Sequence, residues 1–418
     1  MARPVKFLHA ADFHLGAGFI GAQVRDQKLG LRLRAAVFEA FDAVIQTALD
    51  ENIDFAVFAG DLFDVTESNY RAQGHFVEGL RRLEDQGIDV YMVAGNHDPL
   101  DGSDRLALPN NAHLFDSNNV GVMHFEKEGV QPCSLYGRSY PQAEVNSNYA
   151  QAFKRDTCVN AVGILHTNVS TESDLERYAR CDMHDLIDAQ MDYWALGHIH
   201  LTKVLRESNP CVIYPGSPQA LNINETGIHG CYIVELDNGT PTYEWHPAGR
   251  VTMHRVAVDI SSAANEADIR DCVVTTLNTA LPDDSNEHLV RIILTGVSHL
   301  DNALSQEALE TLYNSLCPAL SGPFPNVYLD STIINETLDS VEDDMEHTTN
   351  DFLRDFLDIE LNMVEPSVME SAFQSKQLKT FRQEFPAEFE KINLSLNQEN
   401  ILNEAKELLY RRLMKRGY

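Results

Sequence analysis

The chain has 418 residues, 44% of them hydrophobic, and a formal net charge of −31. The composition excludes a disordered chain, and no apolar run approaches the roughly 18 residues that span a bilayer. We therefore expect a cytoplasmic protein of two or three domains with no membrane attachment. The acidic charge argues against binding nucleic acid by electrostatics alone, unless metal ions, basic patches or a partner supply a positive field. Adaptation to a salty cytoplasm would explain the same charge.

Seven cysteines are spread widely along the chain, and no two of them form a C-x-x-C pair. An odd number of distant cysteines does not fit a disulfide framework or a zinc knuckle. We therefore expect reduced and mostly buried thiols.

Short apolar runs alternate with helical patterns over the first 200 residues. The predicted strands are residues 5–10, 54–60, 89–95, 161–166 and 193–197. One predicted helix spans about 34–50, and another contains Phe76, Leu80 and Leu83 and ends at Gly87. This alternation predicts a layered α/β domain with a largely parallel sheet, whose ligands bind beyond the carboxyl ends of the strands.

The pattern changes after about residue 212 to short β runs, and a second unit is predicted to begin near residue 250. We expect a larger domain at 1–250 and a smaller α/β domain at 251–340, with strands near 253–260 and 288–297. Residues 259–346 contain 17 acidic residues and two arginines, which indicates a solvated acidic face. Residues 350–418 read as helical, with an apolar stripe that includes Leu402 and Leu409 and either packs on its own domain or binds a partner.

Five of the predicted strands end in polar residues of one chemical kind. These residues are Asp12 and His14, Asp61 and Asp64, Asn96, His97 and Asp98, His166, and His198 and His200. Each of these strand ends alone is weak evidence for a metal site, since a lone histidine is more often structural than a ligand. Five endings in one α/β unit would converge on one edge of the sheet. Carboxylates, imidazoles and an amide oxygen without a thiolate suit divalent manganese, iron or zinc.

The spacing of these residues explains how they would share a site. Residues i and i+2 of an extended segment point the same way, so Asp12 with His14, and His198 with His200, can each face one ion. The glycines that precede Asp61, Asn96 and His198 leave room where backbone passes close to ions and substrate. A single aspartate with two oxygens can bridge two cations about 4 Å apart.

The ordered set D-x-H, GD-x-x-D, GNH-D, a lone H and GH-x-H resembles the calcineurin-like metallophosphoesterase superfamily over roughly the first 220 residues. The resemblance implies a layered α/β metallophosphoesterase sandwich. It also implies two divalent ions, manganese first and iron or zinc otherwise. One ion would bind Asp12, His14, Asp61 and His200, and the other Asp61, Asn96, His166 and His198. His97 would protonate the leaving oxygen during hydrolysis of a phosphate ester.

Within the superfamily, "HAADFHLG", "AGDLFD", "AGNHDPL" and "YWALGHIH" resemble the DNA-repair exonuclease branch of SbcD and YhaO-like proteins. That resemblance implies a smaller α/β capping domain at 251–340 and a helical C-terminal segment at 350–418. It also implies a DNA exonuclease or endonuclease, a coiled-coil SMC-like ATPase of the SbcC type as partner, and homodimerisation. A phosphodiesterase or phosphatase for a small phosphate ester is the alternative, which the acidic charge favours. A catalytically inactive scaffold fits poorly, because all seven ligand positions and His97 carry competent side chains. Val65 follows the second aspartate, where protein Ser/Thr phosphatases have an arginine.

The residue at the position of Asp64 differs between branches of the superfamily. In related phosphatases the aspartate here pairs with the catalytic histidine, so the resemblance implies that Asp64 orients His97 and favours its protonated form. The archaeal and eukaryotic repair nucleases have a histidine at this position, whereas the bacterial SbcD pattern has the aspartate. His9 and Arg138 are expected to be structural, and His113, His124, His184 and His229 are left without a role.

Overall fold

A computed structural model describes the fold of residues 4–17, 19, 27–64, 70–101, 107–169, 178–282, 286–298, 306–335 and 338–339. The contacts divide the chain into a larger unit, which comprises Met1–Val258, Glu266–Leu294 and Asn302–Asn335, and a smaller one made of the intervening and following segments. The boundary near residue 250 stays a prediction. The helical pattern predicted for 350–418 lies outside the described residues.

Two six-stranded mixed sheets form most of the larger unit. The first has the strand order β12 (Thr240–Pro247), β11 (Gly230–Asp237), β1 (Val5–Ala10), β2 (Phe55–Ala59), β3 (Asp89–Val93), β4 (Ala112–Leu114). The second has the order β5 (Gly121–Lys127), β6 (Val130–Arg138), β7 (Asn160–His166), β8 (Tyr193–Gly197), β10 (Cys211–Tyr214), β9 (Lys203–Arg206). Strands β1 to β4 are parallel, as are β6, β7, β8 and β10, while β11, β12, β5 and β9 run antiparallel to their neighbours.

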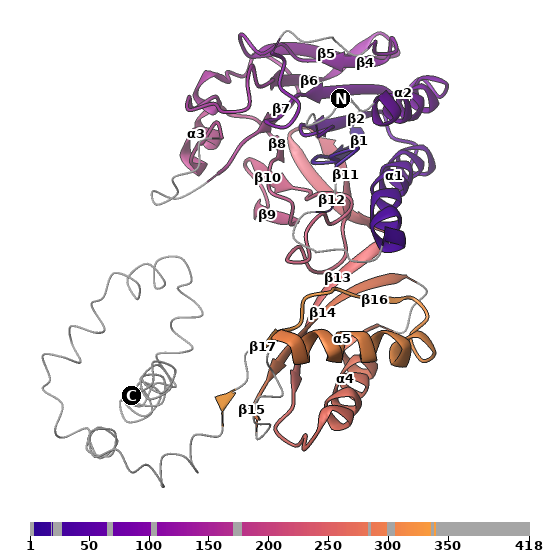
Figure 1. Ribbon diagram of the computed structural model, residues 1–418. Helices are drawn as coiled ribbons and strands as arrows, with labels where there is room; N and C mark the ends of the chain where they lie inside the picture. The colour runs from indigo at the N-terminus through magenta and orange to yellow at the C-terminus, as the bar shows by residue number, and fades with distance from the viewer. Residues whose placement is uncertain are drawn as a thin grey trace, which may run out of the picture. The chain divides into compact units, whose positions relative to one another are not determined.

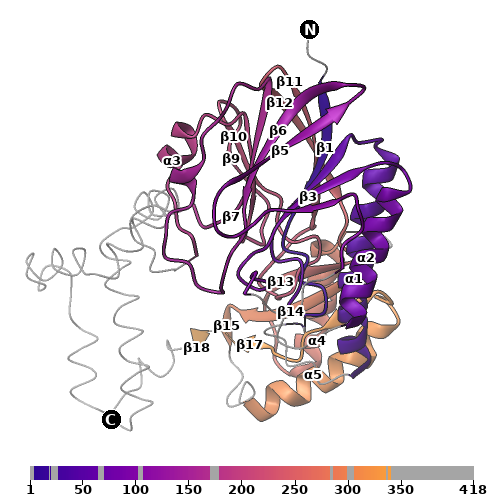
Figure 2. The ribbon, with the colours of Figure 1, turned by 90° about the horizontal axis from the view of Figure 1, so that it is seen from above.

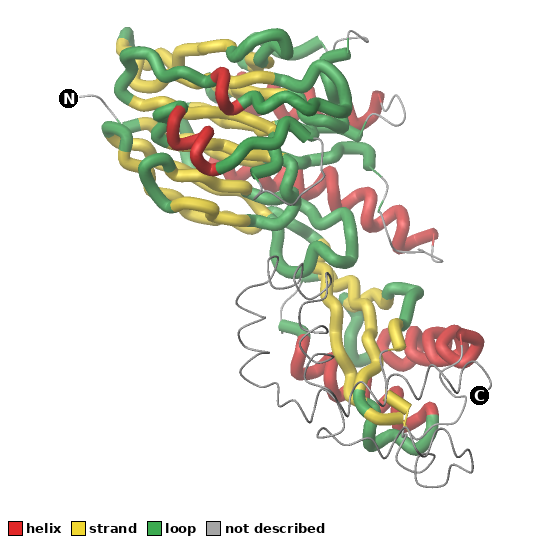
Figure 3. The backbone as a smooth tube through the Cα atoms, turned by 90° about the vertical axis from the view of Figure 1, so that its left-hand side faces the viewer, coloured by secondary structure: helices red, strands yellow, loops and turns green. Residues whose placement is uncertain are grey.

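The two sheets pack face to face between helices, which gives four layers (Figures 1 and 2). Phe7 and Phe55 of the first sheet share an apolar core with Ile164 of the second. Helices α1 (Gln27–Asp50) and α2 (Tyr70–Glu84) cover the outer face of the first sheet, and α3 (Met183–Asp188) with the 3₁₀ turn η1 (Ala150–Ala152) covers the second. Figure 3 shows the strands from the α3 side. The predicted layered α/β fold is confirmed.

Burial on both faces explains why the parallel strands read as continuous apolar runs. In β1, Val5 and Phe7 pack between the sheets, whereas Leu8 and Ala10 pack under the helices. All five residues of β2 are buried. Such strands cannot alternate apolar and polar residues, because neither side chain direction meets water.

Helix α1 begins seven residues before the predicted start near residue 34. Leu29 and Leu33 continue its apolar face and pack against Val251, Met253 and Leu289. Arg32 on the same turn binds the carboxylate of Glu287. Contacts with a distant part of the chain therefore extend the helix beyond the stripe that predicted it.

The segment after residue 250 is a small α/β arrangement, as predicted. Strands β13 (Val251–Asp259), β14 (Glu287–Thr295) and β16 (Val327–Leu329) pair in that order, and β17 (Ile334–Asn335) also pairs with β14. Helices α4 (Glu266–Ala280) and α5 (Gln306–Ser321) pack together beside this sheet (Figure 1). In the smaller unit, β15 (Val297–Ser298) pairs with β18 (Leu338–Asp339).

The seven cysteines are free, and four of them are buried while Cys317 is exposed. Within the described ranges, the structure contains no helix with the length and apolar character needed to cross a membrane.

Candidate metal centre

The five predicted endings meet at one place, but they come from two sheets rather than from one edge of a single sheet. Strands β1, β2 and β3 belong to the first sheet, and β7 and β8 belong to the second. Hydrogen bonds connect the two sheets here, including two that involve the backbone. The His198 amide donates to Asp12 Oδ1 at 2.9 Å, and His166 Nδ1 lies 3.0 Å from the Ala59 carbonyl. The polar residues that follow β1, β2 and β3 therefore face those that follow β7 and β8. Sequence patterns do not reveal this division, because they do not give the strand order.

One group of donors contains Asp12, His14 and His200. Their ligand atoms lie within 4.8 Å of one another, and the Nε2 atoms of the two histidines are 3.1 Å apart. Asp12 and His14 are buried. Two imidazole nitrogens at this separation, beside a carboxylate, could bind one cation.

A second group contains Asn96, His166 and His198. The Asn96 Oδ1 atom lies 2.9 Å from His166 Nε2 and 3.2 Å from His198 Nδ1. The Ala59 carbonyl can only accept a hydrogen bond, so His166 Nδ1 donates to it. The other ring nitrogen of His166, Nε2, therefore faces the site. One amide oxygen and two imidazoles therefore converge on a second position.

Asp61 lies between the two groups. Its Oδ2 atom is 3.3 Å from His166 Nε2 and 3.6 Å from His14 Nε2, and its Oδ1 atom accepts a hydrogen bond from the His97 amide at 2.9 Å. Burial opposes ionisation of this carboxyl, but the neighbouring His166 and His14 outweigh burial and hold its pKa well below the usual range. Asp61 is thus an ionised carboxylate in contact with both groups of histidines.

His97 and Asp64 lie at the open side of the centre. The His97 side chain is 41% exposed, and its Nδ1 atom is 3.7 Å from Asp64 Oδ1, longer than a direct hydrogen bond. The His97 ring is 4.7 Å from the ring of His14. His97 is therefore reachable from solvent while it remains next to the buried donors.

The backbone at four of the predicted ligands is left-handed, a conformation that costs free energy for residues other than glycine. The φ angles are 52° at Asp12, 47° at His14, 49° at Asp61 and 103° at His198. Strained backbone of this kind is concentrated at functional sites, where it directs side chains to one point.

Two glycines leave space for the donor side chains. A Cβ atom on Gly60 would lie 2.6 Å from His166 Nδ1, and one on Gly95 would lie 2.2 Å from Asp61 Oδ1. Both distances are below any that real Cβ atoms adopt. Gly60 and Gly95 therefore leave room for the side chains of His166 and Asp61.

The buried histidines differ in the direction of their pKa shifts. Burial lowers the pKa of His14 and of His198 to about 3, so both are neutral and can donate a lone pair to a metal. Burial also lowers the pKa of His166, but the carboxylates of Asp61 and Asp12 outweigh it and raise the value to about 9. Burial raises the pKa of Asp12 to about 6.

Two further carboxylates support the centre, and neither was assigned a role from the sequence. Asp98 accepts hydrogen bonds from the amides of Leu62 at 2.8 Å and Gly95 at 2.6 Å, so it connects the loops after β2 and β3. Burial raises the pKa of Asp98 to about 7. Glu225 Oε1 lies 2.9 Å from His200 Nδ1. Asp98 belongs to the quoted GNH-D motif, whereas Glu225 lies 25 residues beyond His200 and has no motif of its own.

The residues expected to be structural have structural contacts. His9 is buried, with its ring nitrogens near the Tyr193 hydroxyl and the Leu196 carbonyl. Arg138 donates to the Ser117 carbonyl and stacks on the ring of Tyr149. Of the unassigned histidines, His229 lies between the carbonyls of Ser217 and Glu225, inside the loop that contains Glu225.

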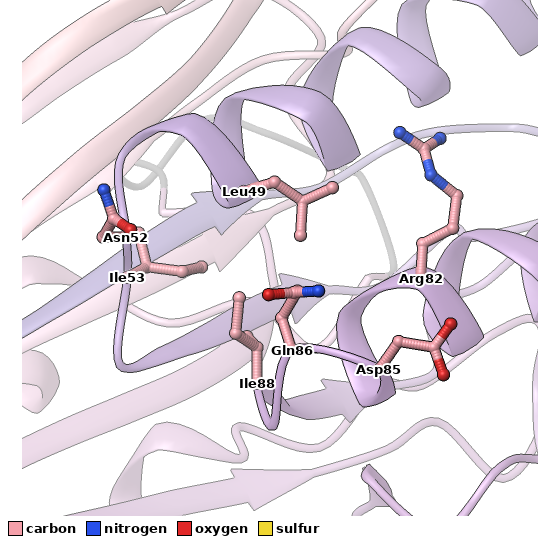
Figure 4. Close-up of a pocket in the computed structure, with 7 residues that line it drawn as sticks. All are labelled: Leu49, Asn52, Ile53, Arg82, Asp85, Gln86 and Ile88. Carbon is pink, nitrogen blue, oxygen red and sulfur yellow. The ribbon is translucent and has the colours of Figure 1, made fainter.

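A separate surface pocket lies at the opposite ends of the strands (Figure 4). It is lined by Leu49, Asn52, Ile53, Arg82, Asp85, Gln86 and Ile88. Ile53 and Ile88 precede β2 and β3, whereas the metal-centre residues follow those strands. The pocket therefore contains none of the predicted site residues.

Layered sheets, a cluster of oxygen and nitrogen donors at their strand ends and the five ordered motifs define a metallophosphoesterase. The calcineurin-like phosphoesterase family matches residues 5–201, and the middle domain of metallophosphoesterase YhaO matches residues 254–334. The chain belongs to the calcineurin-like phosphoesterase family. It is 36% identical over 300 residues to an uncharacterized metallophosphoesterase, YhaO, of Bacillus subtilis, covering 71% of this chain and 73% of that protein.

Two further relatives are named for DNA repair or nuclease activity. The DNA double-strand break repair protein Mre11 of Aeropyrum pernix is 26% identical, with 62% of this chain and 65% of that protein aligned. A component of the nuclease SbcCD of Bacillus subtilis is 27% identical, with 53% of this chain and 64% of that protein aligned. The chain thus spans slightly less than two thirds of the length of these two relatives.

Proposed function

We propose that this protein is a two-metal phosphodiester hydrolase that cleaves DNA as an exonuclease or endonuclease. The observation that supports the proposal best is the position of Asp61 Oδ2, 3.6 Å from His14 Nε2 and 3.3 Å from His166 Nε2. A carboxylate placed between two groups of imidazoles is what a bridging ligand requires. The converging donors also fit divalent cations, with manganese proposed first and iron or zinc as alternatives.

Each predicted side chain then has a proposed task. Asp12, His14 and His200 would bind one ion, Asn96, His166 and His198 would bind the other, and Asp61 would bind both. When bound, two such ions polarise the phosphate and make water a stronger nucleophile. The partly exposed His97 would donate a proton to the leaving oxygen, and Asp64 would keep the His97 ring oriented for that transfer.

DNA is the proposed substrate because the relatives at lower identity are named as a nuclease component and a break-repair protein. From the same resemblance we propose a role in DNA repair, a coiled-coil SMC-like ATPase as partner, homodimerisation and a cytoplasmic location. The proposed division into a phosphoesterase domain at 1–250, a capping domain at 251–340 and a partner-binding region at 350–418 belongs to the same account.

The net charge of −31 favours the alternative, a phosphodiesterase or phosphatase for a small phosphate ester. A compact phosphate would need only the metal centre for binding, whereas a DNA duplex would meet a repulsive surface. The two candidates therefore differ in substrate and share the same chemistry.

Hydrolysis assays with added Mn²⁺ distinguish the candidates. End-labelled linear DNA is compared with a simple phosphodiester and a simple phosphomonoester, and the His97→Ala variant is the control. We expect Mn²⁺-dependent cleavage of DNA that falls by roughly 100-fold or more in His97→Ala. Intact DNA together with rapid turnover of a small ester would reverse the assignment, and no turnover of any substrate would reject hydrolysis altogether.

A further inference from the structure

Glu225 lies on the loop between β10 and β11 and contacts Nδ1 of His200, a proposed metal ligand. Its Oε1 atom is 2.9 Å from His200 Nδ1, and its Oε2 atom accepts a hydrogen bond from the Leu221 amide at 2.8 Å. The Glu225 side chain is only 16% exposed. Both carboxylate oxygens therefore have a fixed partner, and one of them is an imidazole of the centre.

The contact determines which nitrogen of His200 is available to the centre. A carboxylate accepts hydrogen bonds, so Nδ1 of His200 is the donor and Nε2 keeps its lone pair. That Nε2 atom is the one 3.1 Å from His14 Nε2. Because the carboxylate also restricts rotation of the ring, it fixes both the tautomer and the direction of the lone pair.

The loop itself is anchored at both ends, so Glu225 does not move freely. The buried Gln219 side chain accepts from the amides of Arg250 and Val251 and donates to the Val251 carbonyl at 2.8 Å. The Gly227 amide donates to the Met253 carbonyl at 3.2 Å, and the Glu225 amide donates to the Asn222 carbonyl at 2.9 Å. The bonds of Gln219 and Gly227 fasten the loop to the beginning of β13, and the bond of the Glu225 amide closes a turn within the loop, so Glu225 is held in place.

We propose that Glu225 is a positioning residue for metal binding, which sets the tautomer and orientation of His200 through the Nδ1 hydrogen bond. The proposal rests on the proposed function in one respect, because it takes His200 as a metal ligand. It adds a residue outside the five motifs, and it predicts that one of the two ions depends on Glu225 more than the other.

Calorimetric titration of the metal-free protein with Mn²⁺ tests the proposal, because it measures the affinity of each site without turnover. In Glu225→Ala we expect two ions still to bind, with the dissociation constant of one site raised by roughly 10- to 100-fold. Glu225→Gln should lie between the wild type and Glu225→Ala, since its amide oxygen can still accept from His200 Nδ1.

Asn222→Ala is the matched control in the same loop, because the Asn222 side chain accepts only from the Asn224 amide in the described contacts. It should bind Mn²⁺ as the wild type does. The proposal is overturned if Glu225→Ala keeps both wild-type affinities, or if Asn222→Ala loses as much affinity as Glu225→Ala does. A wild-type protein that binds no Mn²⁺ would reject the proposed metal centre as well, and intact binding without hydrolysis would reject the proposed function alone.

Discussion

Asp61 and Asp64 are three residues apart in the chain, yet their surroundings differ. Asp61 is buried in contact with His14 and His166, and Asp64 faces the partly exposed His97. Burial of the Asp61 carboxylate would be costly without positive charge nearby. The proposed roles follow from this difference, with Asp61 as a shared metal ligand and Asp64 as a positioning residue.

The Asp64→Asn variant tests the proposed roles of both aspartates. We expect turnover to fall by roughly 10- to 100-fold, because the neutral amide would no longer hold the His97 ring in the orientation proposed for proton transfer. Both Mn²⁺ ions should remain bound in calorimetric titration, whereas Asp61→Asn should weaken the binding of both. Loss of an ion from Asp64→Asn would instead make Asp64 a metal ligand, since its ligand atom lies within 4.8 Å of those of His14 and His97.

Metal binding is predicted to release a proton from His166. The pKa of this histidine is raised to about 9 in the metal-free site, so at pH 7 it is protonated, and a cation must displace that proton. The affinity for Mn²⁺ should therefore increase as the pH rises toward 9. Titrations at pH 7 in buffers of different ionisation enthalpy should reveal the released proton. Identical binding enthalpies in all buffers would contradict the expectation.

At the scale of elements, the centre is formed where two sheets face each other. The loops after β2 and β3 approach so closely that Gly95 must lack a side chain, since its Cβ atom would lie 2.2 Å from Asp61 Oδ1. The Asp98 carboxylate joins the same two loops through the amides of Leu62 and Gly95. The position of Asp61 thus depends on the packing of neighbouring loops as well as on its own strand.

The Gly95→Ala variant should lower the Mn²⁺ affinity by roughly 10-fold or more, because the new methyl group displaces Asp61. The matched control is Gly74→Ala, on the exposed face of α2, where an added Cβ atom would meet nothing within 4 Å. That control should bind Mn²⁺ normally and gain about 0.5–1 kcal/mol of unfolding free energy. Wild-type affinity in Gly95→Ala would show that Asp61 tolerates the displacement.

The sequence patterns predicted strands β1, β2, β3, β7 and β8 well, because burial on both faces leaves continuous apolar runs, three of which end at Gly60, Gly95 and Gly197. They could not divide those strands between two sheets, since strand pairing depends on long-range contacts. The start of α1 was also wrong, because Leu29 and Leu33 pack on Met253 and Leu289 rather than on the sheet beneath the helix. Glu225 was missed for the same reason, since its partner His200 is distant in the chain.

At the scale of the whole molecule, the charge of −31 opposes the approach of DNA. Residues 259–346 contribute strongly, with 17 acidic residues against two arginines. The metal centre is therefore expected to supply the positive field that a phosphate backbone needs.

DNA binding by this chain should depend on divalent metal. In fluorescence anisotropy with a labelled duplex, we expect no saturation without metal up to about 10 µM protein at physiological salt, and measurable binding once Mn²⁺ is added to a cleavage-deficient His97→Ala variant. Tight binding in the absence of metal would indicate a basic surface elsewhere in the chain and would separate DNA recognition from the centre.

Anomalous diffraction from crystals soaked in Mn²⁺ tests the two-metal centre most directly. The account predicts two peaks about 4 Å apart. One should lie beside Asp12, His14 and His200 and the other beside Asn96, His166 and His198, with Asp61 in contact with both. A single peak, or a peak between Asp64 and His97 with none at Asp61, would contradict it.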